Sequence, residues 1–258
     1  MEAQEIKQII QNWNEAATRL IIINPSCLEK TEETSGNIND PEVIKFFSAL
    51  TSDQGNDVII LGEGTREQLD QLSGFAATLV AENGGFSKDA NGEWQPFITE
   101  SMHWKEPVRK ALRTLVTQYA GSFLEEKYFS MAWHFDSDAG IISTEDRRQL
   151  LTGLRSLAKQ FELVFRELNG SIEFSTPAIG REKFITDWMT RHGHYDLIIA
   201  IGNNADEGLF QLLEGFVTIC VNSRGPTGAR YEIGNSSDIV PTLSSIAFGS
   251  QARNNKSN

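Results

Sequence analysis

The sequence predicts an α/β fold with a parallel central sheet and an α+β module inserted into it. Several short runs are apolar throughout, as in strands buried on both faces: residues 20–23, 58–61 and 77–81. Patterns with helical spacing separate these runs, and such a succession indicates parallel strands joined by crossover helices. Between Trp104 and Thr176 the runs instead mix charged and aromatic residues, which is typical of half-exposed antiparallel strands.

The first part of the chain accounts for three strands of the predicted sheet. A first helix is indicated by apolar residues that share one face at helical spacing: Ile6, Ile9, Ile10, Trp13 and Ala17. The strand at 20–23 ends at the turn sequence Asn24-Pro25-Ser26, and Pro41 suits the first turn of a second helix. The elements that follow are helix 41–50, strand 58–61, helix 66–72 and strand 77–81.

The remainder of the chain holds the inserted module and then the end of the parallel sheet. In the module we expect a helix marked by Val108, Leu112, Leu115 and Val116, strands within 122–135, a helix at 144–161 and a strand at 171–174. Beyond Pro177 the alternation of helices and apolar strands resumes, with a helix at 182–191, a strand at 196–201, a further helix and a strand at 216–221. The predicted domains are therefore 1–103, 104–178 and 179–258, the first and last forming one core.

Composition limits the classes of partner. The chain has 258 residues, and its 23 Lys and Arg against 35 Asp and Glu give a formal net charge of −12. Such an acidic chain is a poor partner for nucleic acid or anionic lipid. The two cysteines, Cys27 and Cys220, lie in or beside apolar runs, which suits reduced and buried thiols. Since no membrane-length apolar run or signal sequence is seen, we expect a cytoplasmic protein.

Chemistry is expected where the parallel strands end. In open α/β sheets, ligands bind beyond the carboxyl ends of the strands. The residues there are mainly amides and glycines, with one hydroxyl and one carboxylate: Asn24 and Ser26 after the first strand, Gly62-Glu63-Gly64 after the second, and Asn203 and Asn204 after the strand at 196–201. After the first strand no carboxylate appears before Glu29. This composition disfavours covalent and acid–base catalysis at this edge.

Three segments carry a resemblance to a known family: residues 79–85 (LVAENGG), 123–135 (FLEEKYFSMAWHF) and 199–210 (IAIGNNADEGLF). They resemble the trehalose-6-phosphate phosphatase family of the haloacid-dehalogenase superfamily, and the similarity extends from about Ile6 to about Leu243. The resemblance implies a Rossmann-type parallel-sheet core with an α+β cap inserted after the third strand. It also implies Mg²⁺-dependent hydrolysis of trehalose 6-phosphate.

The positions that carry the family's chemistry are altered in this sequence. By the resemblance, Asn24 occupies the nucleophile position and Ser26 the acid/base position. Gly62 and Gly64 replace the hydroxyl and arginine that hold phosphate, Glu63 adds a negative charge there, and Arg181 replaces a lysine. Asn203 and Asn204 replace the metal carboxylates, so that we expect neither catalytic residues nor a bound Mg²⁺. Asp206 and Glu207 match the family's acidic pair, but at a helix start they also suit the helix dipole.

The resemblance retains the sugar-binding half of the family's site. It implies that Glu125, Lys127 and Glu173 contact sugar hydroxyls from the cap, and that Asn83 lies near the glucose from the core; a solvated charge run is the simpler interpretation of Glu125 to Lys127. The sequence predicts an inactive phosphatase-like protein that binds trehalose 6-phosphate or trehalose, or that regulates or scaffolds trehalose-6-phosphate synthase. The alternatives are a residual or altered phosphatase using Glu29 or Glu63, and a scaffold without a ligand.

Overall fold

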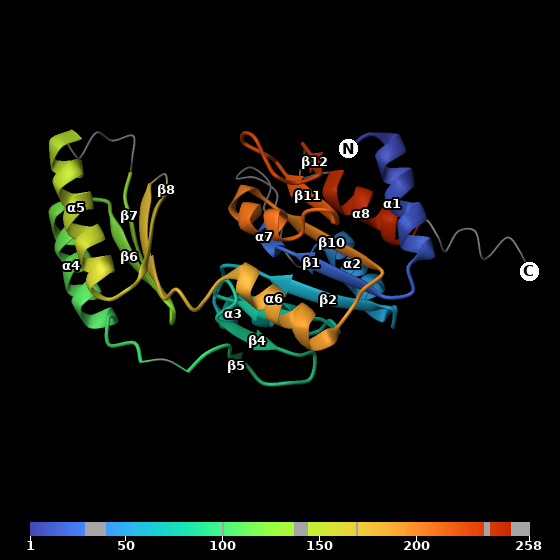
Figure 1. The fold of residues 1–258 in the computed structure, drawn as a ribbon, viewed down its shortest axis with the longest axis horizontal. Coiled ribbons are helices and arrows are strands. Elements are labelled where there is room, and N and C mark those ends of the chain that lie inside the picture. Colours follow the sequence, from blue (N-terminus) through green and yellow to red (C-terminus); the bar gives the residue numbers. More distant parts are fainter. Residues whose placement is uncertain (29–39, 100, 137–143, 169, 235–237, 249–258) are drawn as a thin grey trace, which may run out of the picture. The chain divides into compact units, whose positions relative to one another are not determined.

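The chain forms two compact units. The computed structural model describes residues 1–28, 40–99, 101–136, 144–168, 170–234 and 238–248 (Figure 1). The first unit, here called the core unit, consists of Met1–Gln95 and Arg181–Asn258, and the second, the inserted unit, of Pro96–Gly180. The assignment of residues 104–178 as a cap remains a prediction. Among the described helices, none combines the length and the apolar character that crossing a membrane requires.

The core unit contains an eight-stranded sheet in the order β12-β11-β10-β1-β2-β3-β4-β5. From β12 to β3 neighbouring strands pair in parallel, and β4 pairs antiparallel with β3. The predicted parallel sheet is therefore confirmed. Its strands are β1 (Arg19–Ile23), β2 (Asn56–Leu61), β3 (Thr78–Ala81), β4 (Phe86–Lys88), β5 (Gln95–Pro96), β10 (Leu197–Gly202), β11 (Val217–Val221) and β12 (Tyr231–Ile233).

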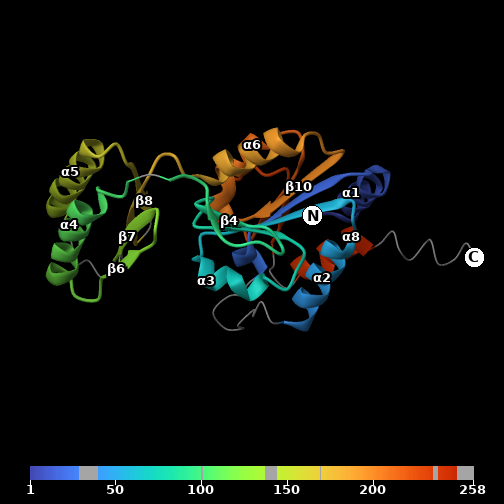
Figure 2. The same cartoon turned by 90° about the horizontal axis from the view of Figure 1, so that it is seen from below.

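Helices cover both faces of this sheet. Side chains of α1, α2 and α8 join one buried apolar cluster with the strands, while α6 lies on the opposite side of the sheet from α2 (Figure 2). The helices and short 3₁₀ turns of the core unit are α1 (Ala3–Glu15), η1 (Pro25–Leu28), α2 (Pro41–Ser52), α3 (Arg66–Leu69), η2 (Asp70–Leu72), α6 (Arg181–His192), η3 (Asn204–Asp206), α7 (Glu207–Leu212) and α8 (Ile239–Phe248).

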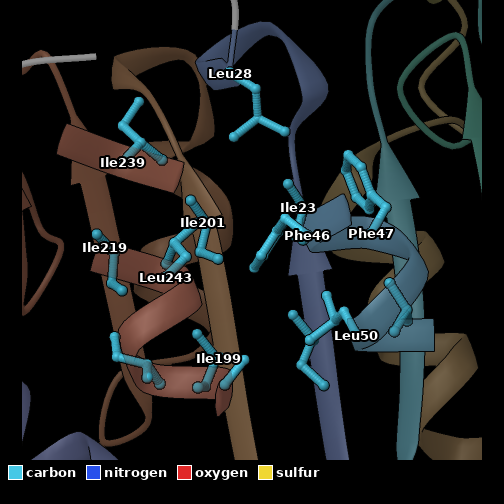
Figure 3. Packing of buried hydrophobic residues seen from close by; sticks show 14 of the residues in the cluster. Ile23, Leu28, Phe46, Phe47, Leu50, Ile199, Ile201, Ile219, Ile239 and Leu243 are labelled. Atoms are coloured by element: carbon cyan, nitrogen blue, oxygen red, sulfur yellow. The ribbon is translucent and has the colours of Figure 1, made fainter. Parts of the chain in front are cut away.

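The cluster beneath α2 and α8 fixes the central strands. Ile23, Ile201 and Ile219 come from β1, β10 and β11, and they lie beside Phe46 of α2 and Leu243 of α8 (Figure 3). Each of these side chains is at most 4 % exposed. Because residues packed this tightly have little freedom to move, the strand ends that carry the candidate site are held in place.

The inserted unit is a four-stranded antiparallel sheet with two helices against one face. Its strand order is β6-β7-β9-β8, and Trp133, Met131 and Phe174 pack beneath the helices with Leu112 and Leu154. The predicted α+β module is confirmed. Its elements are α4 (Lys105–Gln118), β6 (Phe123–Glu126), β7 (Ser130–His134), α5 (Thr144–Gln160), β8 (Val164–Leu168) and β9 (Ser171–Ser175).

Candidate functional site

The candidate site lies where the order of the core sheet reverses. From β1 the chain moves outward through β2 and β3, and it returns on the other side of β1 as β10. Ligands of open α/β sheets bind at such a switch point, outside the carboxyl ends of the strands. We call the residues gathered there the crest: Asn24, Ser26, Gly62, Glu63, Gly64, Asn83, Arg181, Asn203, Asn204 and Asp206.

Arg181 is the centre of the crest. Its side chain is only 8 % exposed, at the first position of α6. The guanidinium donates from Nε to Asn83 Oδ1 at 2.8 Å, from Nη2 to Glu63 Oε2 at 2.9 Å and from Nη1 to Asp206 Oδ1. Burial opposes the charged form, but the carboxylates of Asp206 and Glu63 outweigh it and raise the pKa of Arg181. The crest therefore contains a permanent internal cation.

Asp206 connects this cation to the central strands. Its residue is 1 % exposed, and its Oδ2 accepts hydrogen bonds from Asn24 Nδ2 and from the Asn203 backbone N–H, both at 2.9 Å. Asn24 therefore acts as a donor toward a buried carboxylate. An aspartate at position 24 could not make this contact without binding a proton. The amide at position 24 is thus the residue type that its neighbour requires.

The remaining amide oxygens of the crest also have internal partners. Asn24 Oδ1 accepts from the Ser26 backbone N–H at 3.1 Å and from Ser26 Oγ at 2.8 Å. The Ser26 hydroxyl in turn accepts from Asn203 Nδ2 at 3.2 Å, and Asn203 Oδ1 caps the following 3₁₀ turn. Asn204 Oδ1 accepts from the Arg224 backbone N–H at 2.8 Å. Most side chains of the crest are therefore joined by hydrogen bonds to one another or to neighbouring loops.

Two glycines bring the second loop close to the first and third. A Cβ at Gly62 would lie 3.3 Å from Pro25 Cγ, and the Gly62 carbonyl accepts from the Asn83 N–H at 3.0 Å. The Gly64 carbonyl accepts from the Glu82 N–H at 3.0 Å. Asn83 has φ of +57°, a left-handed conformation that asparagine tolerates better than most residues. The turn that contains this conformation places the Asn83 side chain where it accepts a hydrogen bond from Arg181.

Cys27 lies below the crest and is 4 % exposed. Burial is the main cause that raises the pKa of its thiol, and the charge of Asp206 adds to the effect. The neutral thiol therefore dominates, and the prediction that Cys27 is buried is confirmed.

The predicted sugar contacts of the inserted unit share one face of its sheet. Strand register places Glu125 of β6 and Glu173 of β9 on either side of Ala132 of β7. Since Leu124 and Phe174 pack toward the helices, Glu125 and Glu173 point to the opposite, open face. Glu173 Oε2 lies 3.8 Å from Arg166 Nη1 of β8, within the same row.

Both carboxylate oxygens of Glu125 contact neighbouring side chains of the same unit. Its Oε1 lies 3.1 Å from Lys127 Nζ and its Oε2 lies 2.9 Å from His134 Nε2. Burial opposes ionisation, but the hydrogen bonds with His134 and Lys127 lower the pKa of Glu125. The His134 ring also stacks on Phe123, with ring centroids 4.6 Å apart, and Phe123 is 57 % exposed. An exposed aromatic side chain thus stands beside an ionised, oriented carboxylate.

The comparison with known families decides the assignment. A sequence model of the Trehalose-phosphatase family matches residues 29–217. The chain belongs to the Trehalose-phosphatase family. The matched segment contains most of the crest, although Asn24 and Ser26 precede it.

The relatives of this Trehalose-phosphatase member have low sequence identity to it, but the similarity extends over most of the chain. The alpha,alpha-trehalose-phosphate synthase [UDP-forming] B of Dictyostelium discoideum is 25 % identical over 217 residues, which is 80 % of this chain and 27 % of that protein. The C-terminal domain of Candida albicans trehalose-6-phosphate phosphatase superposes with a TM-score of 0.80 at 19 % identity, covering 94 % and 96 % of the two chains.

A second solved structure is similar in fold. The C-terminal domain of the Candida albicans trehalose synthase regulatory protein gives a TM-score of 0.71 at 17 % identity, with 92 % of this chain and 97 % of that one covered. The match covers between 17 % and 31 % of the length of the curated relatives named trehalose-phosphate synthase.

Mg²⁺, which enzymes of this superfamily use, does not fit the crest. The cation prefers anionic oxygens in octahedral geometry. The residues that the resemblance places at the metal carboxylates are Asn203 and Asn204, whose side-chain oxygens accept backbone N–H bonds. Both oxygens of Asp206 are bonded to donors, one of them the Arg181 guanidinium. Within the described residues, no cluster of three or more His, Cys, Asp or Glu side chains could hold a metal ion.

The structure brings together most of the positions that the resemblance marked in the core, and it changes the interpretation of one. Asn24, Ser26, Asn83, Arg181 and Asn203 form one network. The interpretation of Asp206 as a dipole-stabilising charge at a helix start was incomplete, because its carboxylate is buried and pairs with Arg181. The signal in the sequence is the arginine at 181, since a buried guanidinium requires carboxylate partners.

Proposed function

We propose that this chain is a non-catalytic member of the Trehalose-phosphatase family that binds a trehalose-type sugar and regulates trehalose-6-phosphate synthase. The observation that carries the proposal is the pairing of Arg181 with Asp206, Glu63 and Asn83 at the crest. The family resemblance assigns this edge of the sheet to phosphate and metal binding, and here a guanidinium held by three side chains lies there. The two cysteines are unpaired and buried, which favours the cytoplasm as the location.

The loss of catalysis follows from the chemistry of the crest. Nucleophilic displacement at phosphorus needs an anionic oxygen, but the group at the nucleophile position is the Asn24 amide, whose oxygen accepts from Ser26. General acid–base catalysis needs a group that gains and loses a proton near the working pH. A serine hydroxyl such as that of Ser26 does not do so. Without a nucleophile and a metal, the rate falls by many powers of ten, because phosphate-ester hydrolysis depends on charge stabilisation at the transition state.

Sugar recognition is supported by the open sheet face of the inserted unit. Glu125 is oriented by Lys127 and His134, and Glu173 lies two strands away in the same row. Carboxylates accept from sugar hydroxyls, and the exposed ring of Phe123 offers an apolar surface to the C–H face of a sugar. Of these groups, Glu125, Lys127 and Glu173 are the ones that the family resemblance assigns to sugar contacts.

The regulatory part of the proposal is supported by the relatives. One is named a trehalose-phosphate synthase, and the segment similar to this chain is 27 % of its length. Another shares the fold and is named a trehalose synthase regulatory protein. We therefore propose trehalose-6-phosphate synthase as the protein partner, by analogy with these names.

Two measurements test the proposal. With Mg²⁺ and trehalose 6-phosphate, we expect no phosphate release above background, whereas a trehalose-6-phosphate phosphatase measured in parallel releases phosphate. We also expect the chain to co-purify with the synthase and to change its rate. Phosphate release that disappears in a Glu63→Gln variant would instead establish the alternative, an altered phosphatase; Glu29, the other candidate for that role, lies outside the described residues.

A further inference from the structure

We infer that the crest selects an uncharged sugar and rejects a phosphate ester, and that Glu63 is the residue that imposes this choice. The inference rests on the proposed function and makes it more specific. Of trehalose and trehalose 6-phosphate, it assigns trehalose as the ligand of the whole chain.

The first argument is that the cation of the crest is already neutralised. Arg181 is the one cationic residue among those that define the crest, and its side chain is 8 % exposed. Each of its three nitrogens donates to a different side chain: Nε to Asn83, Nη1 to Asp206 and Nη2 to Glu63. These bonds occupy three of the five N–H donors of the guanidinium, so that a phosphate would have to share this buried cation with two carboxylates. Asp206 is itself fixed by two further hydrogen bonds.

The second argument is the sign of the local charge. Arg181 contributes one positive formal charge, while Glu63 and Asp206 contribute two negative ones, so that the group has a net charge of −1. The Glu63 side chain is 48 % exposed, and it is therefore the part of this group that an approaching ligand meets. A phosphate dianion beside it would experience like-charge repulsion.

The third argument is that the same carboxylate favours hydroxyl groups. An ionised carboxylate only accepts hydrogen bonds, and a sugar hydroxyl can donate one to it. Glu63 follows β2, and its backbone lies in the turn whose neighbours Gly62 and Gly64 are bonded to Asn83 and Glu82. The carboxylate is thus held in a fixed turn, attractive for O–H donors and repulsive for phosphate.

Two other cationic residues lie near the crest in the chain or in space. Arg66, three residues after Glu63, has its guanidinium carbon 4.2 Å from the centroid of the Phe86 ring. Arg224 reaches the crest through its backbone N–H, which is bonded to Asn204. Because the Arg224 side chain is exposed, the experiment includes an Arg224→Gln variant as a separate arm.

Calorimetric titration of the full chain with trehalose and with trehalose 6-phosphate tests the inference. We expect trehalose to bind about fivefold more tightly or better, the order expected for like charges at a half-exposed site. In Glu63→Gln the affinity for trehalose 6-phosphate should rise by about the same factor, because the repulsive charge is gone. The matched control is Glu214→Gln, which removes a charge just before β11, at the opposite edge of the parallel sheet.

The outcomes separate this inference from the proposed function. Equal or tighter binding of trehalose 6-phosphate overturns the inference, and a loss of that binding in Arg224→Gln would identify the cation that was used instead. If neither affinity responds to Glu63→Gln, Glu63 is not the selecting residue and the inference fails. Binding of neither sugar overturns the inference together with the sugar-binding part of the proposed function. Phosphate release from trehalose 6-phosphate contradicts the proposed function itself, whatever the relative affinities.

Discussion

Arg181 shows how a single residue type can change the chemistry of a site. A lysine, which the family resemblance expects there, is a compact point charge on a flexible stem. The planar guanidinium instead presents several N–H groups in fixed directions, and here they reach Asn83, Glu63 and Asp206 on three different loops. The lysine-to-arginine change thus supplies a cation that the protein itself binds on three sides.

Removing this cation should destabilise the fold. In Arg181→Leu the buried Asp206 loses its counter-charge, and we expect the free energy of unfolding to fall by about 3–5 kcal/mol, the usual cost of breaking a buried pair. Urea denaturation measures it. The double variant Arg181→Leu/Asp206→Asn should recover part of the loss, and the control Arg191→Leu on the exposed part of α6 should change it by about 0.5 kcal/mol or less. A fully stable Arg181→Leu would contradict the buried pair.

Gly202 is required for the position of Asp206. A Cβ at Gly202, the last residue of β10, would collide with the Asp206 carboxylate. We therefore expect Gly202→Ala to lower the free energy of unfolding by about 1–3 kcal/mol, as overpacking does. The control is Gly153→Ala in α5, where a Cβ meets no atom within 4 Å. In a helix that change should stabilise by up to about 1 kcal/mol. Equal effects of the two substitutions would refute the steric argument.

Sequence reasoning found the residues of the crest better than their interactions. Asn24 and Asn203 are expected at one edge because they follow strands with clear patterns, whereas Arg181 is marked only by the family resemblance. The partners of Arg181 were not predicted, because the pairs Arg181–Glu63 and Arg181–Asp206 join residues that are 118 and 25 positions apart in the chain. Local periodicity contains no information about such contacts. The negative charge of Asp206 was also explained locally, because a carboxylate at a helix start suits the helix dipole.

At the level of elements, burial on both faces decides what the sequence reveals. The strands β1, β2, β3, β10 and β11 were predicted because each is an almost continuous apolar run. β8, by contrast, was missed since Arg166 and Glu167 interrupt it and most of it is exposed. β4, β5 and β12 have two or three residues each, too few for a pattern. α8 was missed because Pro241 and two serines obscure its helical spacing.

The contact between α4 and β6 yields a prediction with a pH dependence. Glu126 of β6 accepts from Arg109 Nε at 2.9 Å and lies 3.1 Å from Lys105 Nζ. The hydrogen bonds from Arg109 outweigh the effect of burial and, with Lys105, lower the pKa of Glu126 to about 2. Because the folded-state pKa lies below the unfolded value, the stabilisation exists above the unfolded pKa and is lost as the pH falls through about 2.

Glu126→Gln should therefore lower the free energy of unfolding at pH 7, by about 1 kcal/mol given that the pair is partly exposed. The difference between the variant and the original chain should shrink toward zero as the pH approaches 2. Thermal unfolding of both proteins across this range measures it. Glu106→Gln is the control, because the Glu106 side chain, also in contact with Arg109, is 79 % exposed. A difference that grows on acidification would contradict a lowered pKa at Glu126.

The whole molecule combines a strongly acidic chain with an internal cation at its switch point. A formal net charge of −12 would ordinarily favour bound cations at clusters of carboxylates. At the crest, however, Arg181 provides the counter-charge for Glu63 and Asp206. The positive charge beside these two carboxylates is therefore supplied by a side chain of the protein itself.

This arrangement predicts a thermal stability that does not depend on divalent cations. A ligand that binds only the folded state raises the melting temperature, and the rise grows with its concentration relative to its dissociation constant. We therefore expect equal melting temperatures in millimolar MgCl₂ and in EDTA, measured by calorimetry at constant ionic strength. NaCl matched in ionic strength is the control for screening. A rise that is specific to Mg²⁺ and lost in Asp206→Asn would show that the crest binds the metal.

The mutual fit of the crest loops also restricts how this lineage can change. Placing aspartate at position 24 alone would set two carboxylate oxygens against each other where the Asn24 amide now donates to Asp206. Placing lysine at 181 alone would leave Glu63 and Asp206 short of donors. Each single substitution is thus penalised unless its partners change as well, so that the crest can be rebuilt only by several coordinated changes.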